Sequence, residues 1–529
     1  MNIIQQPNKE IIFLLGVNPY FKDWTYRLNK YCIIEELEDG TSLIFNTMTR
    51  AMVSLNEIER ENMFNYGSER FEFLLNNYFL VKDDYDEEAK IDEIRFKWAP
   101  VIDDRYIEER YSFLIVTTTG CNARCFYCYE RKMSKVPMTL KTAEDVVQYI
   151  LKKAKNPNKE IKLDWFGGEP LFNMKVIDYI CQKLVDNGRT FISSMISNGY
   201  LFDESVVEKA ANFWKLNHIQ ITLDGTEEVY NKAKNYIYKN QDEVSPFKKV
   251  MHNIGLLVGK NIGVSIRMNV DLYNADDLKV LINELGEKYK DNKNLGVYVW
   301  PIFEDEEFSR DEEHRQKVFD KIYELEDVMK EYGWARSGNV GTSIRSHHCM
   351  IDGQYNVIIG TQGDLGLCEH YVDSEFFGSI YHDNIDWDVV MAFREYHPKI
   401  EACHTCPRYP SCLRPNKCKD LKQCTPQFQE FELRHDRASM RKMYEQWMER
   451  ENRKRSGNNR KNCSGSSCQT PQNNNGSCNA HYKQPPTHCT QYNGQTGMVR
   501  IDSVPSNNTI DLSKLSFWRK AKLLFSKNK

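Results

Sequence analysis

The chain has 529 residues, of which 41% are hydrophobic and 28% charged, a composition ordinary for a soluble globular protein. This length predicts more than one domain, and no apolar run approaches the ~20 residues of a membrane helix. The most apolar early stretch, residues 11–17, is too short for a span and lacks a basic leader, so we expect no signal peptide and a cytoplasmic location.

The formal net charge of −4 is unevenly distributed, because residues 451–529 carry 13 Lys and Arg against 3 Asp and Glu. A basic tail on an acidic body suits an acidic partner, a nucleic acid or an anionic membrane surface, and it equally suits a solvated extension. Because the rest of the chain is acidic, we expect that it does not bind a nucleic acid.

Residues 1–98 form an N-terminal segment in which residues 26–90 predict a small winged-helix-like unit. Two alternating apolar runs flank Asp39-Gly40 and predict a hairpin over residues 32–46. Helical patterns follow at 57–66 and 69–77, then a short strand at 79–81. The acidic residues 83–88 predict a linker.

From 111 to 301 the pattern alternates between strand and helix, within a domain expected to span 105–335. The predicted strands are 112–118, 161–166, 190–197, 218–224, 264–270 and 297–301, and amphipathic helices are predicted at 141–155, 173–187, 203–215 and 276–288. Such alternation predicts an α/β fold with a parallel sheet, arranged as a partial (β/α)6 barrel. Chemistry in such folds lies at the carboxyl ends of the strands.

The sequence CNARCFYCYE, residues 121–130, follows the first of these strands and contains Cys121, Cys125 and Cys128. Three thiolates can hold three corners of a cubane iron–sulfur cluster and leave the fourth iron open. The alternative is a zinc site completed by a distant His or Cys. The aromatic residues Phe126, Tyr127 and Tyr129 favour the cluster, since they would shield a cofactor-bearing loop from water.

The three-cysteine motif resembles the signature of radical S-adenosylmethionine (radical SAM) enzymes, whose fold is a partial βα barrel. The resemblance implies that Cys121, Cys125 and Cys128 hold a catalytic 4Fe-4S cluster whose open iron chelates S-adenosylmethionine. Reductive cleavage would then give methionine and a 5′-deoxyadenosyl radical, which abstracts a hydrogen atom. The cofactor carries this chemistry and the protein orients it.

Further motifs at the ends of consecutive predicted strands agree with this resemblance over residues 111–301. In WFGGEPL, Gly167 and Gly168 would let the backbone approach the cofactor, and Glu169 would accept from its ammonium group. The other predicted cofactor contacts are Ser197 and Asn198 after the third strand, Asp224 after the fourth, and Arg267 with Asn269 on the fifth.

A second cysteine field occupies residues 349–424 and resembles the SPASM extension of radical enzymes that modify peptides. Its spacings are Cys349-x13-Gly363-x4-Cys368 and Cys403-x2-Cys406-x5-Cys412, but five residues rather than three precede Cys418. The predicted domain spans 336–455, including a charged helix at 426–455.

The resemblance implies two auxiliary 4Fe-4S clusters. Cys403, Cys406, Cys412 and Cys424 would ligate one cluster, while Cys349, Cys368 and Cys418 would ligate the other and leave a position open. His347 or His348 could fill that position, a substrate thiolate could bind there, or both histidines could be surface residues. Structural zinc is the alternative for the whole field.

With a SPASM extension, the N-terminal unit resembles the peptide-recognition element of enzymes that mature ribosomally made peptides, which binds a leader peptide as an added strand. We therefore expect a peptide maturase that forms cysteine thioether crosslinks, supplied with electrons by a donor such as flavodoxin or ferredoxin. Carbon–carbon crosslinking, epimerisation and sulfatase maturation remain open, as does a non-catalytic iron–sulfur carrier or scaffold.

Residues 456–529 are rich in Asn, Ser, Gly and Gln and cannot bury enough apolar surface to fold alone. Their four cysteines are Cys463, Cys468, Cys478 and Cys489, so this tail is either a fused or mimicked substrate or a linker with incidental thiols. The last residues predict a basic amphipathic helix that could contact a membrane or an exporter. The isolated Cys32 and Cys181 are expected to be small buried hydrophobes.

Overall fold

The computed structural model describes residues 1–95, 111–237, 244–303, 306–334, 336, 351, 356–394, 400–412, 414 and 417–461. The predicted ligand Cys349, its neighbours His347 and His348, and the tail from residue 462 onward with its predicted C-terminal helix lie outside these residues. Within the described part, no helix combines the length and hydropathy needed to cross a membrane.

The N-terminal unit is built on a four-stranded antiparallel sheet with strand order β1-β5-β4-β3. Its elements are β1 (Asn2–Gln5), α1 (Lys9–Leu15), β2 (Tyr26–Leu28), β3 (Cys32–Glu36), β4 (Ser42–Asn46), β5 (Met52–Leu55), α2 (Glu57–Glu61), α3 (Glu69–Asn76) and β6 (Leu80–Lys82). The predicted hairpin is confirmed, since β3 pairs with β4 around Gly40, which has φ +80°. The sheet extends beyond the predicted unit, because β1 pairs with β5.

The prediction that residues 83–88 form a linker is wrong for its last two residues, whereas 83–86 are a turn and irregular chain. Residues 87–95 are helical, and the side chains of Glu87 and Glu88 are buried. They are stabilised there by Arg27 and Lys30, whose cationic groups contact the two carboxylates. A run of acidic residues looks solvated in the sequence, but paired carboxylates can be buried.

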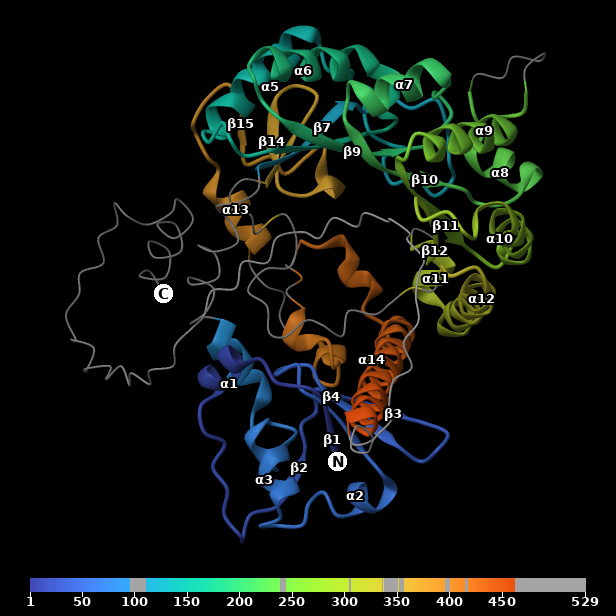
Figure 1. The fold of residues 1–529 in the computed structure, drawn as a ribbon. Coiled ribbons are helices and arrows are strands. Elements are labelled where there is room, and N and C mark those ends of the chain that lie inside the picture. Colours follow the sequence, from blue (N-terminus) through green and yellow to red (C-terminus); the bar gives the residue numbers. More distant parts are fainter. Residues whose placement is uncertain are drawn as a thin grey trace, which may run out of the picture. The chain divides into compact units, whose positions relative to one another are not determined.

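The central sheet confirms the predicted parallel α/β architecture (Figure 1). Its six consecutive strands are all parallel: β7 (Tyr111–Thr118), β8 (Ile161–Gly167), β9 (Phe191–Ser197), β10 (Leu216–Thr222), β11 (Gly263–Val270) and β12 (Leu295–Pro301). The sheet continues past β7 into β13 (Asn356–Ile359), β14 (Asp364–Gly366) and β15 (Gly378–Ser379), which the sequence did not predict.

The crossover helices lie along the outer side of this sheet (Figure 1). They are α5 (Leu140–Lys153), α6 (Met174–Asp186), α7 (Glu204–Asn212), α8 (Glu227–Lys234), α9 (Pro246–Gly259), α10 (Ala275–Tyr289), α11 (Glu306–Arg310) and α12 (Glu312–Glu331). Each long helix buries one apolar stripe; α6, for example, buries Val176, Ile177, Ile180 and Leu184 together with Cys181. Cys181 is therefore a buried apolar residue, as predicted, whereas Cys32 is half-buried.

Besides β13, β14 and β15, the described residues of the second cysteine field form α13 (Trp387–Arg394) and short 3-10 turns at Glu369–Tyr371, Glu401–Cys403, Tyr409–Ser411 and Lys419–Gln423. The predicted charged helix follows as α14 (Pro426–Lys461). Its first part packs Phe428 and Phe431 against Trp300 of β12, and Met440 against the N-terminal sheet.

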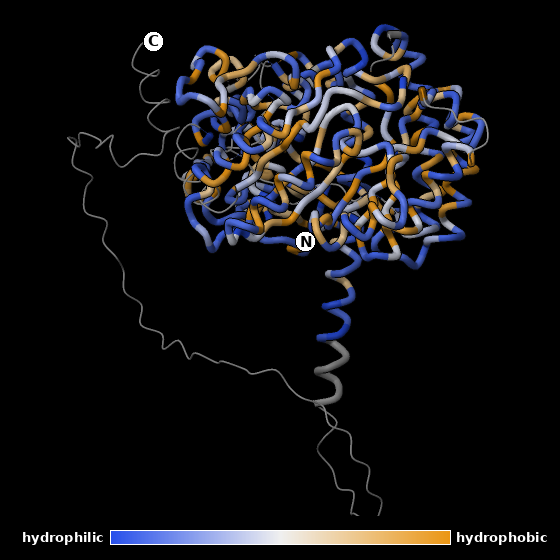
Figure 2. The backbone as a smooth tube through the Cα atoms, turned by 90° about the horizontal axis from the view of Figure 1, so that it is seen from above, coloured by the Kyte–Doolittle hydropathy of each residue, from blue (hydrophilic) through white to orange (hydrophobic). Residues whose placement is uncertain are grey.

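A separate compact unit begins at Glu445. Its described part is the remainder of α14, whose residues as far as 454 are mostly hydrophilic (Figure 2).

Candidate active site

The three cysteines of residues 121–128 lie in the loop that directly follows β7. All three are half-buried, and they line one cavity of about 320 Å³ at the carboxyl end of the sheet. The amide of Ala123 donates to Sγ of Cys121 at 3.4 Å, and Cys128 N donates to Cys125 O at 3.3 Å. A cavity of this size is in the range of small-molecule sites.

Gly167 and Gly168 hold the end of β8 against the backbone that leads into this loop. A Cβ atom on Gly167 would lie 2.0 Å from the carbonyl oxygen of Thr118, and one on Gly168 would lie 2.5 Å from that of Gly120. Gly167 also has φ +136°, a conformation that L side chains rarely adopt. Both glycines line the cavity, but the close approach they permit is to the protein backbone before Cys121.

Glu169 is fully buried and does not line the cavity. Its carboxylate accepts from the amides of Leu171 and Asn198 at 3.1 and 2.8 Å and from the hydroxyl of Ser197. Burial raises the pKa of Glu169 to about 7 against the effect of these donors. In this structure the group therefore fastens the β8 loop to the end of β9, where the sequence predicted a cofactor contact.

Asp224 belongs to a buried ionic network under the cysteine loop, and it too lies outside the cavity lining. Its carboxylate contacts Lys234 Nζ at 2.9 Å, accepts from the hydroxyl of Tyr127, and accepts from Asn269 Nδ2 at 3.0 Å. Lys234 Nζ also lies 2.8 Å from the Tyr127 hydroxyl. Asp224 thus positions a side chain of the cysteine loop.

Burial alone lowers the pKa of Lys234, but the combined attraction of Asp224, Tyr127, Cys125 and Tyr230 outweighs this effect and holds the pKa well above its ordinary value. The ammonium therefore stays charged within electrostatic reach of Cys125, which contributes to the same shift. Sequence reasoning missed Lys234, since a lysine at the end of an amphipathic helix has no feature that marks it as buried.

The remaining predicted contacts, Ser197, Asn198, Arg267 and Asn269, all line the cavity. Asn198 Nδ2 lies 2.7 Å from Asn122 Oδ1 and 3.9 Å from Cys121 Sγ, while Arg267 Nε donates to Asn269 Oδ1 at 2.9 Å. The structure therefore brings the predicted residues of the first, second, third and fifth strands to one cavity. Its other cations, Arg124, Arg131, Lys135 and Lys234, give it a basic wall.

The donor set fits an iron–sulfur cluster at the first motif. Burial raises the pKa of Cys121 to about 12 and also that of Cys128, and the neighbouring thiols add to both shifts. Three such thiolates need the positive charge of bound metal. Across the described residues, no three Cys, His, Asp or Glu side chains surround a single ion site; a cubane differs, since each of its irons takes its own thiolate.

Four cysteines of the second field converge in space. Burial raises the pKa of Cys403, and the thiols of Cys412 and Cys424 raise it further. Burial likewise raises the pKa of Cys406 to about 12, with Cys412 and Cys403 adding to the shift. These four residues are the set that the sequence assigns to one auxiliary cluster.

Cys368 and Cys418, assigned to the other cluster, share a neighbour. Burial raises the pKa of Tyr371, and both thiols contribute to that shift. The adjoining Glu369 and His370 line the same cavity as the first three cysteines, and the ring of Tyr129 lies 5.2 Å from that of His370. The three-cysteine motif and the second cysteine field therefore line one cavity.

The residues around the three-cysteine loop match a known protein family. Residues 115–285 match the model of the radical SAM superfamily, and this span runs from the second half of β7 through β11 and includes the three-cysteine loop. The chain contains a radical SAM domain. The sequence had predicted the α/β fold of this domain, and its three-cysteine motif had indicated the same family.

Several curated relatives match parts of the chain. A radical SAM cyclopropyl synthase, TigE, of Paramaledivibacter caminithermalis is 24% identical over 231 residues, which cover 37% of this chain and 48% of the relative. An uncharacterised protein of Methanocaldococcus jannaschii is 30% identical over 116 residues, covering 22% and 38%. A GTP 3′,8-cyclase of Clostridium perfringens is 26% identical over 185 residues, covering 34% and 53%. The chain thus spans about half, or less, of the length of these relatives.

Two solved structures resemble the chain more loosely. The enzyme anSMEcpe with bound AdoMet has 17% identity and a TM-score of 0.48, covering 64% of this chain and 99% of its own. SuiB of Streptococcus suis bound to S-adenosylmethionine has 14% identity and a TM-score of 0.41, covering 74% and 95%.

Proposed function

We propose that this protein is a radical SAM peptide maturase with auxiliary iron–sulfur clusters. The observation that supports this most directly is the shared cavity, lined by Cys121, Cys125 and Cys128 on one side and by Glu369 and His370 of the second cysteine field on the other. A 4Fe-4S cluster held by the three cysteines would supply the electron that cleaves S-adenosylmethionine.

The chain's own residues take distinct roles in this proposal. Ser197, Asn198, Arg267 and Asn269 contact the polar groups of S-adenosylmethionine from the cavity wall. Gly167 and Gly168 shape that wall, while Glu169 and Asp224 act from behind it, one on the β8 loop and the other on Tyr127. The basic side chains of the cavity wall would attract the carboxylate of S-adenosylmethionine.

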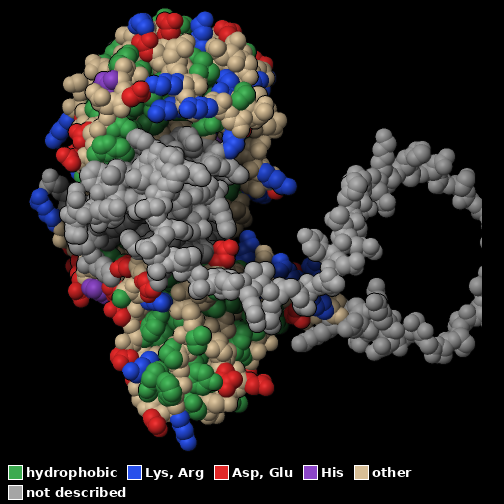
Figure 3. All heavy atoms as spheres, turned by 90° about the vertical axis from the view of Figure 1, so that its left-hand side faces the viewer, with side chains coloured by type: hydrophobic (Ala, Val, Ile, Leu, Met, Phe, Trp, Pro, Cys, Tyr) green, Lys and Arg blue, Asp and Glu red, His purple; other side chains and the backbone are tan. Residues whose placement is uncertain are grey.

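The N-terminal sheet offers an edge on which a peptide can bind. Strand β3 is the last strand of that sheet, and its Ile34 is 39% exposed. An extended peptide that pairs with β3 would satisfy the backbone groups of this edge and cover Ile34. Hydrophobic side chains also reach the surface elsewhere on the unit, as the lower part of Figure 3 shows. Phe13, for example, is 81% exposed.

A thioether crosslink is the favoured reaction. Forming one carbon–sulfur bond removes a hydrogen atom from a peptide carbon, which the 5′-deoxyadenosyl radical takes, and a proton from a cysteine thiol. One further electron leaves the peptide, and a cluster at the second cysteine field would accept it. A flavodoxin or ferredoxin would supply electrons for the initial cleavage.

The test uses a synthetic peptide that copies residues 456–495, which include all four tail cysteines, added to anaerobically reconstituted and reduced protein with S-adenosylmethionine. Each thioether lowers the peptide mass by two hydrogens and blocks one thiol against alkylation. Full alkylation of all four thiols, in this peptide and in the chain's own tail, would reject the tail as a substrate. A mass change without thiol loss would favour carbon–carbon crosslinking or another modification.

A second candidate is a nucleotide substrate, because relatives with the name GTP 3′,8-cyclase match the domain and the cavity wall is basic. GTP replaces the peptide in the same assay. Consumption of GTP coupled to 5′-deoxyadenosine would support this candidate over peptide maturation.

A further inference from the structure

The segment between Cys403 and Cys412 contributes a core residue to the N-terminal unit. Tyr409 is 7% exposed and packs in one hydrophobic cluster with Ile11, Tyr31, Ile91 and Ile94, against which Cys403 also lies. Its ring stacks on that of Tyr31 with centroids 5.7 Å apart and planes at 18°. Folding of the N-terminal unit therefore fixes a residue that stands three positions from both Cys406 and Cys412.

Arg95, at the end of the helical residues 87–95, fastens the backbone of the same segment. Its guanidinium donates to the carbonyl oxygens of Tyr409, Pro410 and Cys412, the last at 2.8 Å. It also lies over the Tyr409 ring, 4.8 Å from the centroid. A single nitrogen of the guanidinium, Nη2, thus contacts three carbonyl oxygens of this segment, including that of a predicted iron ligand. The planar group also lies over the Tyr409 ring in a way that a lysine ammonium cannot reproduce.

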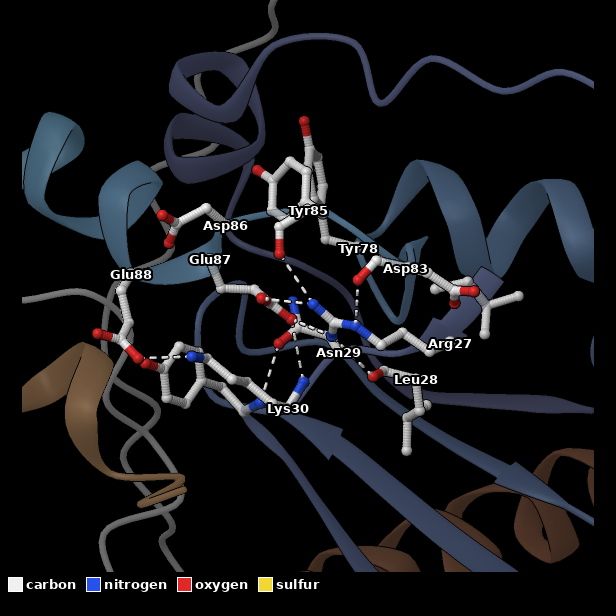
Figure 4. A network of polar contacts seen from close by, with 12 residues as sticks. Arg27, Leu28, Asn29, Lys30, Tyr78, Asp83, Tyr85, Asp86, Glu87 and Glu88 are labelled. Atoms are coloured by element: carbon white, nitrogen blue, oxygen red, sulfur yellow. Dashed lines mark hydrogen bonds and ion pairs between the residues drawn. The ribbon is translucent and has the colours of Figure 1, made fainter. Parts of the chain in front are cut away.

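Two further contacts tie the segment to the N-terminal unit. The hydroxyl of Thr47 lies 2.6 Å from the carbonyl oxygen of Pro407, and His404 Nδ1 lies 2.9 Å from Glu88 Oε1. Glu88 is itself part of the network in Figure 4, where it pairs with Lys30 while the neighbouring Glu87 accepts from Arg27. The contact of His404 is therefore linked through Glu88 to Lys30, in the loop between β2 and β3.

Helix α14 holds the segment from another side. Arg408 donates to both carboxylate oxygens of Asp436 at 2.8 Å and contacts Glu432, and Gln429 Nε2 donates to Ala402 O at 2.9 Å. Bidentate pairs of this kind fix orientation as well as position. The cysteine segment is thus clamped between α14 and the N-terminal unit.

We infer that the N-terminal unit forms one wall of the auxiliary site of Cys403, Cys406, Cys412 and Cys424, with Arg95 as a positioning residue. This inference rests on the proposed function, because it assumes that those cysteines bind a cluster. Linkage makes the coupling reciprocal: a fold that holds the ligands in place is itself stabilised when iron binds. Peptide docking on the N-terminal sheet and the auxiliary site then influence each other through Tyr409 and Arg95.

The first experiment compares iron content and electron paramagnetic resonance spectra of reconstituted full-length variants. Arg95→Met is expected to lose the iron of one cubane, about four atoms per chain, while the signal that responds to S-adenosylmethionine remains. Arg95→Lys should recover only part of the loss. The matched control is Arg60→Met, which removes an exposed pair with Glu36 in the same unit. Full iron content in Arg95→Met would overturn the role of Arg95.

The second experiment needs no variant, so misfolding of Arg95→Met cannot obscure the answer. Hydrogen exchange is measured on wild-type protein with and without iron, for peptides that cover residues 27–55 and 87–95. Exchange there is expected to slow about tenfold on iron loading, in the usual range of coupling between sites. Equal exchange in both forms would overturn the inference.

Failure of the proposed function gives a different result. Wild-type protein that binds only the iron of the first motif, about four atoms per chain, would show that the second field holds no cluster. Retained auxiliary iron with unchanged exchange would instead reject the coupling alone.

Discussion

Replacing Lys234 with Met should destabilise the barrel strongly, because it leaves the Asp224 carboxylate buried without its cation. The side chains of Lys234 and Asp224 are 3% and 2% exposed, and their charged atoms lie 2.9 Å apart. Coulomb's law at an effective dielectric constant of about 20 gives about 6 kcal/mol for this pair. Removing the ammonium also removes the cost of keeping that charge out of water, and this offsets part of the lost attraction. Removing one partner of a buried pair typically costs about 3–5 kcal/mol.

Urea unfolding of the metal-free protein, followed by tryptophan fluorescence and circular dichroism, measures this loss as a shift in the midpoint of the barrel transition. Lys162→Met is the control, because the Lys162 side chain is 51% exposed in its pair with Asp164 and its loss should cost less than about 1 kcal/mol. Adding Asp224→Asn to Lys234→Met should restore part of the stability. A loss no greater than that of Lys162→Met would refute the reasoning.

Two other substitutions probe the loop and its buried carboxyl. Gly167→Ala places a Cβ atom 2.0 Å from Thr118 O, so it should lower iron uptake at the first motif and lower the free energy of unfolding by about 2 kcal/mol or more. The control is Gly259→Ala, whose Cβ atom would have no atom within 4 Å and which should leave iron uptake and stability unchanged. Equal iron uptake in both variants would contradict this. Because burial raises the pKa of Glu169 to about 7, above its unfolded value, its contribution to stability is present at low pH and is lost as pH rises through about 7. Glu169→Gln should therefore flatten this decline in urea titrations of metal-free protein between pH 5 and 8, and an unchanged slope would rule out Glu169 as its source.

Much of the fold could be predicted because its signals are local and periodic. The six parallel strands follow apolar runs, and the three-cysteine loop directly follows the first of them. The carboxyl ends of parallel strands meet at one edge, so Ser197, Asn198 and Arg267 could be placed at a common cavity from strand order alone.

The features that could not be predicted depend on contacts between residues that are far apart in the sequence. Nothing local distinguishes Lys234 from a solvated lysine, or Glu87 and Glu88 from a charged linker, because their partners lie elsewhere in the chain. The pairing of β13 with β7 joins residues far apart in sequence for the same reason. The protein contacts of Glu169 and Asp224 could not be predicted either, because the buried donors that reach their carboxylates are invisible in a motif.

The most direct test of radical chemistry at the three-cysteine loop is formation of 5′-deoxyadenosine. Anaerobically reconstituted wild-type protein is reduced with S-adenosylmethionine, beside Cys125→Ala and the control Cys181→Ala, which alters a buried thiol on α6. We predict 5′-deoxyadenosine from the wild type and from Cys181→Ala, and none from Cys125→Ala. Equal product from Cys125→Ala, or none from iron-replete wild type with peptide or GTP present, would contradict the account.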